Sequence, residues 1–186
     1  MVYPGRIEMT TEPFTDLWQN TYVKAGVDTS SLLQVRMRDE TFSFFVRTEF
    51  DMKHVSDQCG IVIYLDSENW LKAFVECGDD TAWQVGSVVT NAGWSDWAAE
   101  KISPGLREMW YRLDRRGHDY RVCVSFDGTS YEPIRVFHLW DSERTVPVGM
   151  YACSPGDSSF QAAFTDIHFE PCEWPDPSQE DQAAQQ

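Results

Sequence analysis

The sequence predicts an all-β protein, either a β-sandwich or a β-barrel. About ten short segments alternate apolar and polar residues with the period of two that is typical of β-strands. Turn-forming residues separate these segments at intervals of roughly 8 to 14 residues, as in antiparallel sheets. No segment keeps a helical period over about ten residues, so helices are not expected to contribute to the core.

The expected elements, in chain order, begin with residues 1–31, an irregular extension that is expected to lie across a sheet edge. A hairpin follows, with strands over residues 32–38 and 42–50, the second of which turns phenylalanine, valine and threonine toward the core. Residues 91–105 hold two tryptophans and are expected to form a long loop. Further strands are expected at residues 60–65, 70–77, 83–90, 109–114, 119–126, 131–139, 146–152 and 160–169.

The length and composition favour one folded domain. A chain of 186 residues that is 42% hydrophobic is long enough to bury one sizeable core. No apolar run approaches the ~20 residues that a membrane helix needs, so no membrane partner is expected. The net charge of −15 disfavours a nucleic-acid partner, because an acidic surface repels a phosphate backbone. Residues 171–186 are acidic and rich in proline and glutamine, and are expected to form a disordered tail.

The cysteines and the N-terminus predict a cytoplasmic protein. The five cysteines are an odd number, and Cys77 and Cys123 lie within apolar strand patterns, where a free thiol behaves as a small hydrophobe. The first residues lack the apolar core of a signal peptide. The alternative is a secreted chain whose signal peptide has been removed, but the cysteines show no disulfide framework.

Residues 70–77 carry the strongest functional signal. The odd-numbered residues of this segment are apolar and are expected to face the core. The other face mixes aromatic rings with opposite charges, namely Trp70, Lys72, Phe74 and Glu76. This mixture predicts a binding surface, and the alternative is an aromatic cluster with a solvated charge pair. Lys72 and Glu76 would stand ~13 Å apart on a flat strand, so each needs a partner from another strand, and Arg112 is the expected partner of Glu76.

Several short motifs occur in an order that is more specific than any one of them. They are DQCG at residues 57–60, WLK at 70–72 followed by Glu76, SVVT at 87–90, SDW at 95–97, WYR at 110–112, SFDG at 125–128, GMYACSP at 149–155 and FTD at 164–166. Over about residues 32–170 the chain therefore resembles a domain-of-unknown-function family that includes the fungal regulation-of-enolase protein. That family belongs to the concanavalin A-like lectin/glucanase superfamily.

The resemblance implies a jelly roll of two antiparallel sheets over residues 32–170, with a concave sheet where relatives in the superfamily hold sugars. A carbohydrate or small polyol is therefore the expected ligand. Sugars bind when the apolar face of the ring stacks on an aromatic side chain, while amides, carboxylates and guanidinium groups hold the hydroxyls. The positions that match the family pattern, and that are expected to line the ligand site, are Asp57, Gln58, Trp70, Lys72, Glu76, Asp96, Trp97, Trp110 and Arg112. For Trp110 the alternative is a core position.

Two other functions remain open at this point. One is a glycoside hydrolase or lyase with an unusual carboxylate pair, in which Glu76 acts together with Asp57 or Asp96. Hydrolases of the superfamily commonly place Glu, Asp and Glu at alternating positions of one strand, and no strand here has that pattern. The other is a regulatory protein-interaction module acting in carbohydrate metabolism, whose protein partner would dock on an apolar patch around Trp94 and Trp97.

Neither a metal nor another cofactor is expected. The histidines are scattered without a short ligand spacing. Asp79 and Asp80 could contribute to a calcium site, but two adjacent acids after a glycine are more typical of a solvated turn. The sequence has no glycine-rich phosphate-binding loop.

Overall fold

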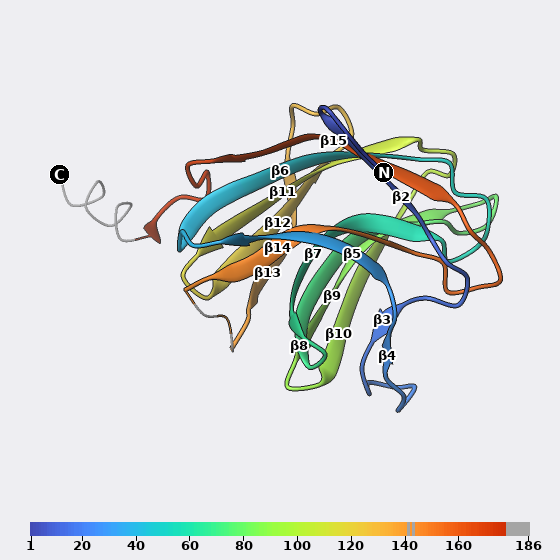
Figure 1. Cartoon of the computed structure of the whole chain (residues 1–186), viewed down its shortest axis with the longest axis horizontal. Coiled ribbons are helices and arrows are strands. Elements are labelled where there is room, and N and C mark those ends of the chain that lie inside the picture. The colour runs from blue at the N-terminus through green and yellow to red at the C-terminus, as the bar shows by residue number, and fades with distance from the viewer. Residues whose placement is uncertain (141, 143, 178–186) are drawn as a thin grey trace.

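The computed structural model describes residues 1–140, 142 and 144–177, and shows two antiparallel sheets packed face to face (Figure 1). The seven-stranded sheet has the spatial order β1 (Val2–Tyr3), β2 (Arg6–Thr10), β15 (Gln161–Glu170), β6 (Thr41–Phe50), β11 (Glu108–Arg116), β12 (Asp119–Ser125) and β13 (Glu132–His138). The six-stranded sheet has the order β10 (Trp94–Ile102), β9 (Trp83–Asn91), β8 (Asn69–Glu76), β7 (Gln58–Asp66), β14 (Val146–Cys153) and β5 (Ser31–Met37). The predicted all-β jelly-roll sandwich is confirmed.

The main core lies between the two sheets and follows from the alternation of their strands. On β6, Phe42, Phe44, Val46 and Phe50 point inward, as expected. On β8 the odd-numbered residues enter the same core, opposite them. Each such side chain contributes roughly 1.5–3 kcal/mol by leaving water. The even-numbered residues of β8 therefore face out of the sandwich.

A second, smaller apolar cluster covers part of the outer face of the six-stranded sheet. The N-terminal segment forms its roof through a short hairpin of β3 (Leu17–Trp18) and β4 (Val27–Asp28), labelled beside this sheet in Figure 1. The cluster consists of Leu17, Val62, Trp70, Phe74, Val88, Tyr151 and Cys153. Three hydrogen bonds tie the roof to the turn between β9 and β10 and to the start of β10. The Gln19 backbone N–H donates to Ser95 Oγ at 2.9 Å, the Ser95 backbone N–H donates to the Gln19 carbonyl oxygen at 3.2 Å, and Asn20 Nδ2 donates to the Gly93 carbonyl oxygen at 2.8 Å.

Two expectations for the edges of the sheets are wrong. Residues 1–31 are not irregular throughout, because β2 pairs with β15 and adds itself and β1 to the seven-stranded sheet. Residues 91–105 are not one long loop, because β10 pairs with β9 along its full length after a two-residue turn at Ala92 and Gly93, which both have positive φ. These strands are short or exposed on both faces, so they lack the apolar alternation that reveals a half-buried strand.

The segment after β15 is folded where the structure describes it. Arg116 Nε donates a hydrogen bond to the Trp174 carbonyl oxygen at 2.8 Å, and the Arg121 guanidinium lies 5.4 Å from the Trp174 ring centroid. The expectation of a disordered tail is therefore wrong for residues 171–177, and its remainder, residues 178–186, lies outside the described residues. The five cysteines are free thiols, and no helix among the described residues is long and apolar enough to cross a membrane.

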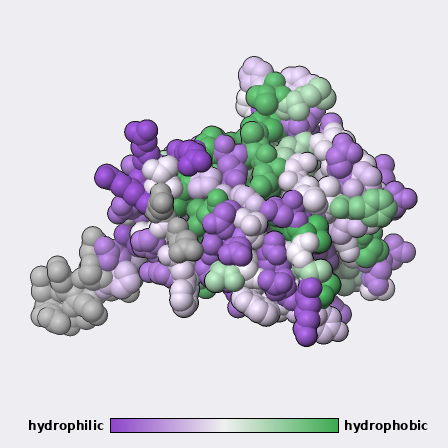
Figure 2. Space-filling view, turned by 60° about the horizontal axis from the view of Figure 1, so that its bottom comes forward, coloured by the Kyte–Doolittle hydropathy of each residue, from purple (hydrophilic) through white to green (hydrophobic). Residues whose placement is uncertain are grey.

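The surface is mainly hydrophilic, but apolar residues gather in a band on the face shown in Figure 2. Several large apolar side chains are exposed, including Tyr22 and Val23 at the tip of the β3–β4 hairpin, Trp94 and Trp97 on β10, and Trp140 after β13. A contiguous apolar band on an otherwise hydrophilic surface commonly marks a binding surface.

Candidate functional site

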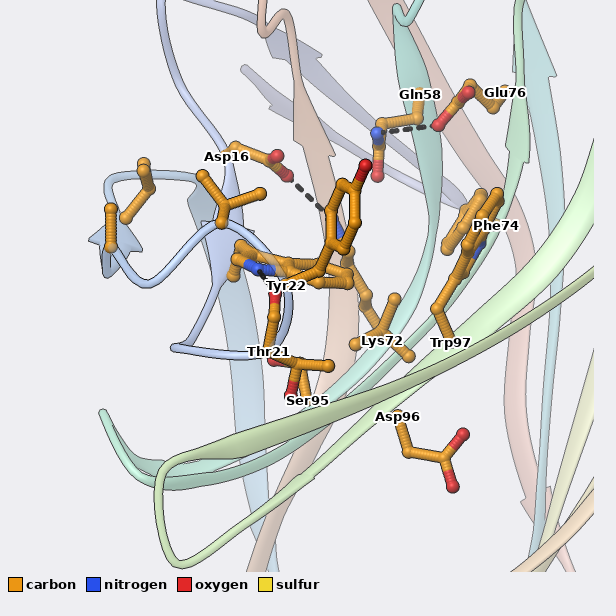
Figure 3. A pocket seen from close by; sticks show the side chains of 15 residues that line it. Asp16, Thr21, Tyr22, Gln58, Lys72, Phe74, Glu76, Ser95, Asp96 and Trp97 are labelled. Carbon is orange, nitrogen blue, oxygen red and sulfur yellow. Dashed lines mark hydrogen bonds and ion pairs between the residues drawn. The ribbon is translucent and has the colours of Figure 1, made fainter.

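A pocket of about 800 Å³ lies between the β3–β4 hairpin and the outer face of the six-stranded sheet (Figure 3). This volume is within the range of small-molecule sites. We call it the hairpin pocket. Its lining from the N-terminal segment includes Asp16, Trp18, Thr21, Tyr22 and Val27. Its lining from the sheet includes Gln58, Lys72, Phe74, Glu76 and Trp97.

The register of the sheet places the lining residues in rows that cross its strands. In one row, Lys72 is opposite Val88, and Val88 is opposite Trp97. The next row on this face holds Phe74, and the row after it holds Glu76 on β8, opposite Gln58 on β7. Directly opposite side chains in antiparallel strands start about 5 Å apart, so the members of one row are direct neighbours.

Lys72 is a buried cation with a counterion from the N-terminal segment. Its Nζ lies 2.6 Å from Asp16 Oδ1, and its side chain is only 3% exposed. The same carboxylate oxygen accepts a hydrogen bond from the Leu17 backbone N–H at 2.7 Å, which fixes it at the start of β3. On its other side, Lys72 Nζ lies 5.5 Å from the Phe74 ring centroid. The pair leaves the ammonium group neutralised and held in place.

Glu76 is a half-buried ionisable group of the pocket, and its neighbour is an amide. Gln58 Nε2 donates a hydrogen bond to Glu76 Oε2 at 3.1 Å, and Tyr151 donates one to Gln58 Oε1 at 3.0 Å, which sets the direction of the amide. Burial raises the pKa of Glu76 to about 7, against the effect of Lys72 and with a further contribution from Asp16. Near neutral pH the side chain therefore retains a proton in a large share of molecules.

Aromatic rings stand on two sides of the pocket. Tyr22 comes from the roof and is 96% exposed, while Trp97 comes from β10 and is 53% exposed. In Figure 3, Tyr22 lies toward Asp16, whereas Phe74 and Trp97 lie together across the pocket. Tyr22 has a positive φ of 64°, a conformation that costs a non-glycine residue of order 1 kcal/mol or more.

The structure brings four of the nine residues predicted for the site together in this pocket: Gln58, Lys72, Glu76 and Trp97. A fifth, Asp96, borders the pocket, but its carboxylate points away from the other labelled side chains (Figure 3) and lies 3.0 Å from Arg135 Nη2 on β13. Asp96 therefore links the edges of the two sheets.

Two more predicted residues lie close by but are buried away from the pocket. Trp70 is fully buried in the cluster beneath the hairpin, where it supports the roof. Asp57 is also fully buried, and its carboxylate accepts hydrogen bonds from Ser158 Oγ at 2.7 Å and from the His54 backbone N–H at 3.2 Å. Both residues hold the surroundings of the pocket in shape without reaching a ligand in it.

The last two predicted residues lie on the other sheet. Trp110 and Arg112 belong to β11 of the seven-stranded sheet, where the Arg47 guanidinium lies 5.2 Å from the Trp110 ring centroid. Arg112 forms ion pairs with Asp114 and Glu173, so the expectation that it pairs with Glu76 is wrong. The alternation predicts that a residue faces outward, but it does not tell on which of the two sheets that outer face lies.

Asp16 lines the pocket and pairs with Lys72, although the sequence did not reveal it as a site residue. It is 56 positions from Lys72 and lies in a stretch without regular alternation, so no local spacing connects the two. The available signal was indirect, because a lysine on a buried face requires a counterion from somewhere in the chain. Among the described residues, no group of three histidine, cysteine, aspartate or glutamate side chains could hold a metal ion.

A family model described as "Protein of unknown function (DUF1349)" matches residues 2–172. The chain belongs to the DUF1349 family. The resemblance inferred from the motifs is thus confirmed, and the matched range is longer than the expected 32–170. It includes the whole N-terminal segment that forms the roof of the pocket in this DUF1349 domain.

Three relatives show the extent of the similarity. Regulation of enolase protein 1 of Saccharomyces cerevisiae is 29% identical over 162 residues, which cover 87% of this chain and 80% of that protein. The crystal structure of a functionally unknown protein from Saccharomyces cerevisiae has a TM-score of 0.84 and 26% identity, and the match covers 92% and 90% of the two chains. A variant of the GH43 protein BlXynB from Bacillus licheniformis has a TM-score of 0.69 at 17% identity, over 91% of this chain and 33% of that one.

The DUF1349 domain thus corresponds to about a third of the length of the GH43 chain. At 17% identity that likeness shows the shared sandwich fold alone. The domain thus shares its fold with part of a GH43 chain and is similar in sequence to Regulation of enolase protein 1 of yeast.

Proposed function

We propose that this DUF1349 domain binds a carbohydrate or small polyol in the hairpin pocket. The observation that carries the proposal is the combination, in one pocket, of exposed aromatic rings with a fixed set of buried polar groups. Tyr22 and Trp97 offer faces on which the apolar side of a sugar ring can stack. Gln58 and Glu76 lie on the same face of the sheet, beyond the row of Phe74, where they can hold hydroxyl groups of a ligand that stacks on the neighbouring Phe74 and Trp97 rings.

The polar groups are arranged for hydrogen bonding to oxygen atoms of a ligand. Glu76 Oε2 is occupied by Gln58, whereas none of the described residues donates a hydrogen bond to Glu76 Oε1. That oxygen can accept a bond from a hydroxyl when Glu76 is ionised, or donate its own proton when Glu76 is neutral. The likeness to a GH43 protein supports a sugar ligand, as a proposal drawn from fold.

A hydrolase is the second candidate, favoured by the raised pKa of Glu76, which suits a general acid. It needs a second carboxylate across the scissile bond. Asp57 and Asp96 are turned away from the pocket, and Asp16 is already bound to Lys72. Binding without turnover is therefore the better-supported proposal. Release of reducing ends from a polysaccharide panel, abolished in Glu76→Gln, would favour the hydrolase instead.

Calorimetric titration with a panel of monosaccharides and oligosaccharides tests the binding proposal. We expect Trp97→Ala to weaken the affinity for any bound sugar about tenfold, because stacking on an aromatic ring contributes roughly 1 kcal/mol or more. Trp94→Ala is the matched control, since Trp94 is 64% exposed on the same strand but does not line the pocket. A panel in which nothing binds, or equal losses in the two variants, would overturn the proposal.

A further inference from the structure

We propose that the ligand of the hairpin pocket carries a positive charge, as an amino sugar does, and that its ammonium group pairs with Glu76. This inference rests on the proposed function and names the class of sugar. It starts from the charges that line the pocket and from the partner that each of them has.

No lysine, arginine or histidine among the described residues forms an ion pair with Glu76. Among the described residues that line the pocket, Lys72 is the one cation, and it is committed to Asp16 at 2.6 Å. The Lys72 side chain is buried between that carboxylate and the Phe74 ring, so it cannot turn to Glu76 without leaving its counterion unpaired. The negative charge of Asp96 points away and is met by Arg135. The carboxyl group of Glu76 therefore faces the pocket with only an amide beside it.

The other ionisable groups near Glu76 do not change this balance. The charges that act on it are those of Lys72 and Asp16, which oppose each other. The thiols of Cys77 and Cys153 are also close, but burial raises their pKa values to about 11 and about 12, so both stay neutral. Burial itself is the largest influence, and it raises the pKa of Glu76 to about 7. A cationic group of a ligand beside Glu76 would favour the ionised carboxylate and would lower its pKa.

The geometry leaves a place for such a cation. Gln58 holds Glu76 Oε2, and Glu76 Oε1 is available to accept a hydrogen bond from an ammonium group. The rings of Phe74 and Trp97 lie together beside this position (Figure 3), where their faces can contact a cationic ligand as well as the apolar side of a sugar. The net charge of −15 also raises the local concentration of cations near the protein.

The test uses three matched pairs of ligands that differ in one amino group: glucose and glucosamine, galactose and galactosamine, and mannose and mannosamine. Affinities are measured by calorimetry at pH 6.5 in two buffers with different ionisation enthalpies. We expect at least one amino sugar to bind about tenfold or more tightly than its hexose, with release of up to one proton per ligand. In Glu76→Gln the ratio within the pair should fall to about one, and the proton release should disappear.

Asp96→Asn is the matched control, because it removes a carboxylate from the rim without changing the one that faces the pocket. It should keep the ratio. A second measurement needs no variant: in the wild type the affinity for the amino sugar should rise from pH 5.5 to about 7 relative to that for the hexose, as Glu76 gives up its proton more readily. If hexoses bind but the ratio stays near one, or if Glu76→Gln leaves it unchanged, the charge inference is wrong and the proposed function stands. If none of the six sugars binds, the charge inference fails, and the proposed function fails with it when the wider panel of oligosaccharides gives no binding either.

Discussion

Replacement of Glu76 by glutamine should stabilise the folded protein in a pH-dependent way. Burial raises the pKa of this carboxyl from its usual 4.5 to about 7 in the folded protein. Between these two values the folded state keeps a proton that the unfolded state has released, so stability falls as the pH rises through this window. Below pH 4.5 both states are protonated and the penalty vanishes.

The magnitude follows from the size of the shift. Each unit of pKa corresponds to about 1.4 kcal/mol, so the penalty above pH 7 is at most about 3.5 kcal/mol. The partial exposure of Glu76 reduces it, and about 2 kcal/mol is a reasonable expectation. Glutamine keeps the shape and can still accept the hydrogen bond from Gln58. Glu76→Gln should therefore be more stable than the wild type by about 2 kcal/mol at pH 8, and nearly equal to it at pH 4.

Urea denaturation of both proteins at pH 4, 6 and 8 measures this difference directly. Glu100→Gln, at an exposed position of β10, is the matched control and should show the same small difference at every pH. The reasoning would be refuted if Glu76→Gln changed the free energy of unfolding equally at pH 4 and pH 8, or if it destabilised the protein at pH 8.

Three other substitutions test separate parts of the structure. Lys72→Met should lower the free energy of unfolding by about 3 kcal/mol in urea denaturation, because it leaves the Asp16 carboxylate without its counterion. Trp70→Ala should cost about 3–5 kcal/mol in the same assay, since it empties a fully buried position beneath the hairpin; a loss below 1 kcal/mol would show that the roof collapses into the space. Arg112→Ala should leave sugar affinity in calorimetry within about twofold of the wild type, as β11 lies on the other sheet; a tenfold loss would place the site elsewhere.

The alternation of side chains predicted much of this fold because most strands are half-buried. Ten strands, β5 to β9 and β11 to β15, lie close to their expected ranges. The face of β8 that carries Lys72 and Glu76 points out of the core, as its period of two requires. The strands that escaped prediction are β1 to β4 and β10, which are two to five residues long or exposed on both faces. Where neither face is buried, the sequence is under little pressure to alternate.

The site was harder to predict, because it depends on which strands become neighbours. Trp110 and Arg112 match the outward pattern of a binding face as well as Lys72 does, yet they lie on the opposite side of the sandwich. Asp16 belongs to the N-terminal roof of the pocket, and no periodic pattern in the sequence predicts that roof. Register and sheet order arise from contacts between segments far apart in the chain. The residue pattern of one segment alone does not show which strand it will pair with.

Because the short hairpin of β3 and β4 forms its roof, the hairpin pocket depends on the N-terminal segment as well as on the six-stranded sheet. A shortened protein that begins at β5 would keep the core between the two sheets. It would lose β1 and β2 from the edge of the seven-stranded sheet, and the β3–β4 roof from the outer face of the six-stranded sheet. Water would then contact Trp70, Phe74 and Tyr151 directly. Such a fragment should aggregate readily and should not bind the sugar, even if its two sheets still form. The first thirty residues are thus needed to enclose the hairpin pocket.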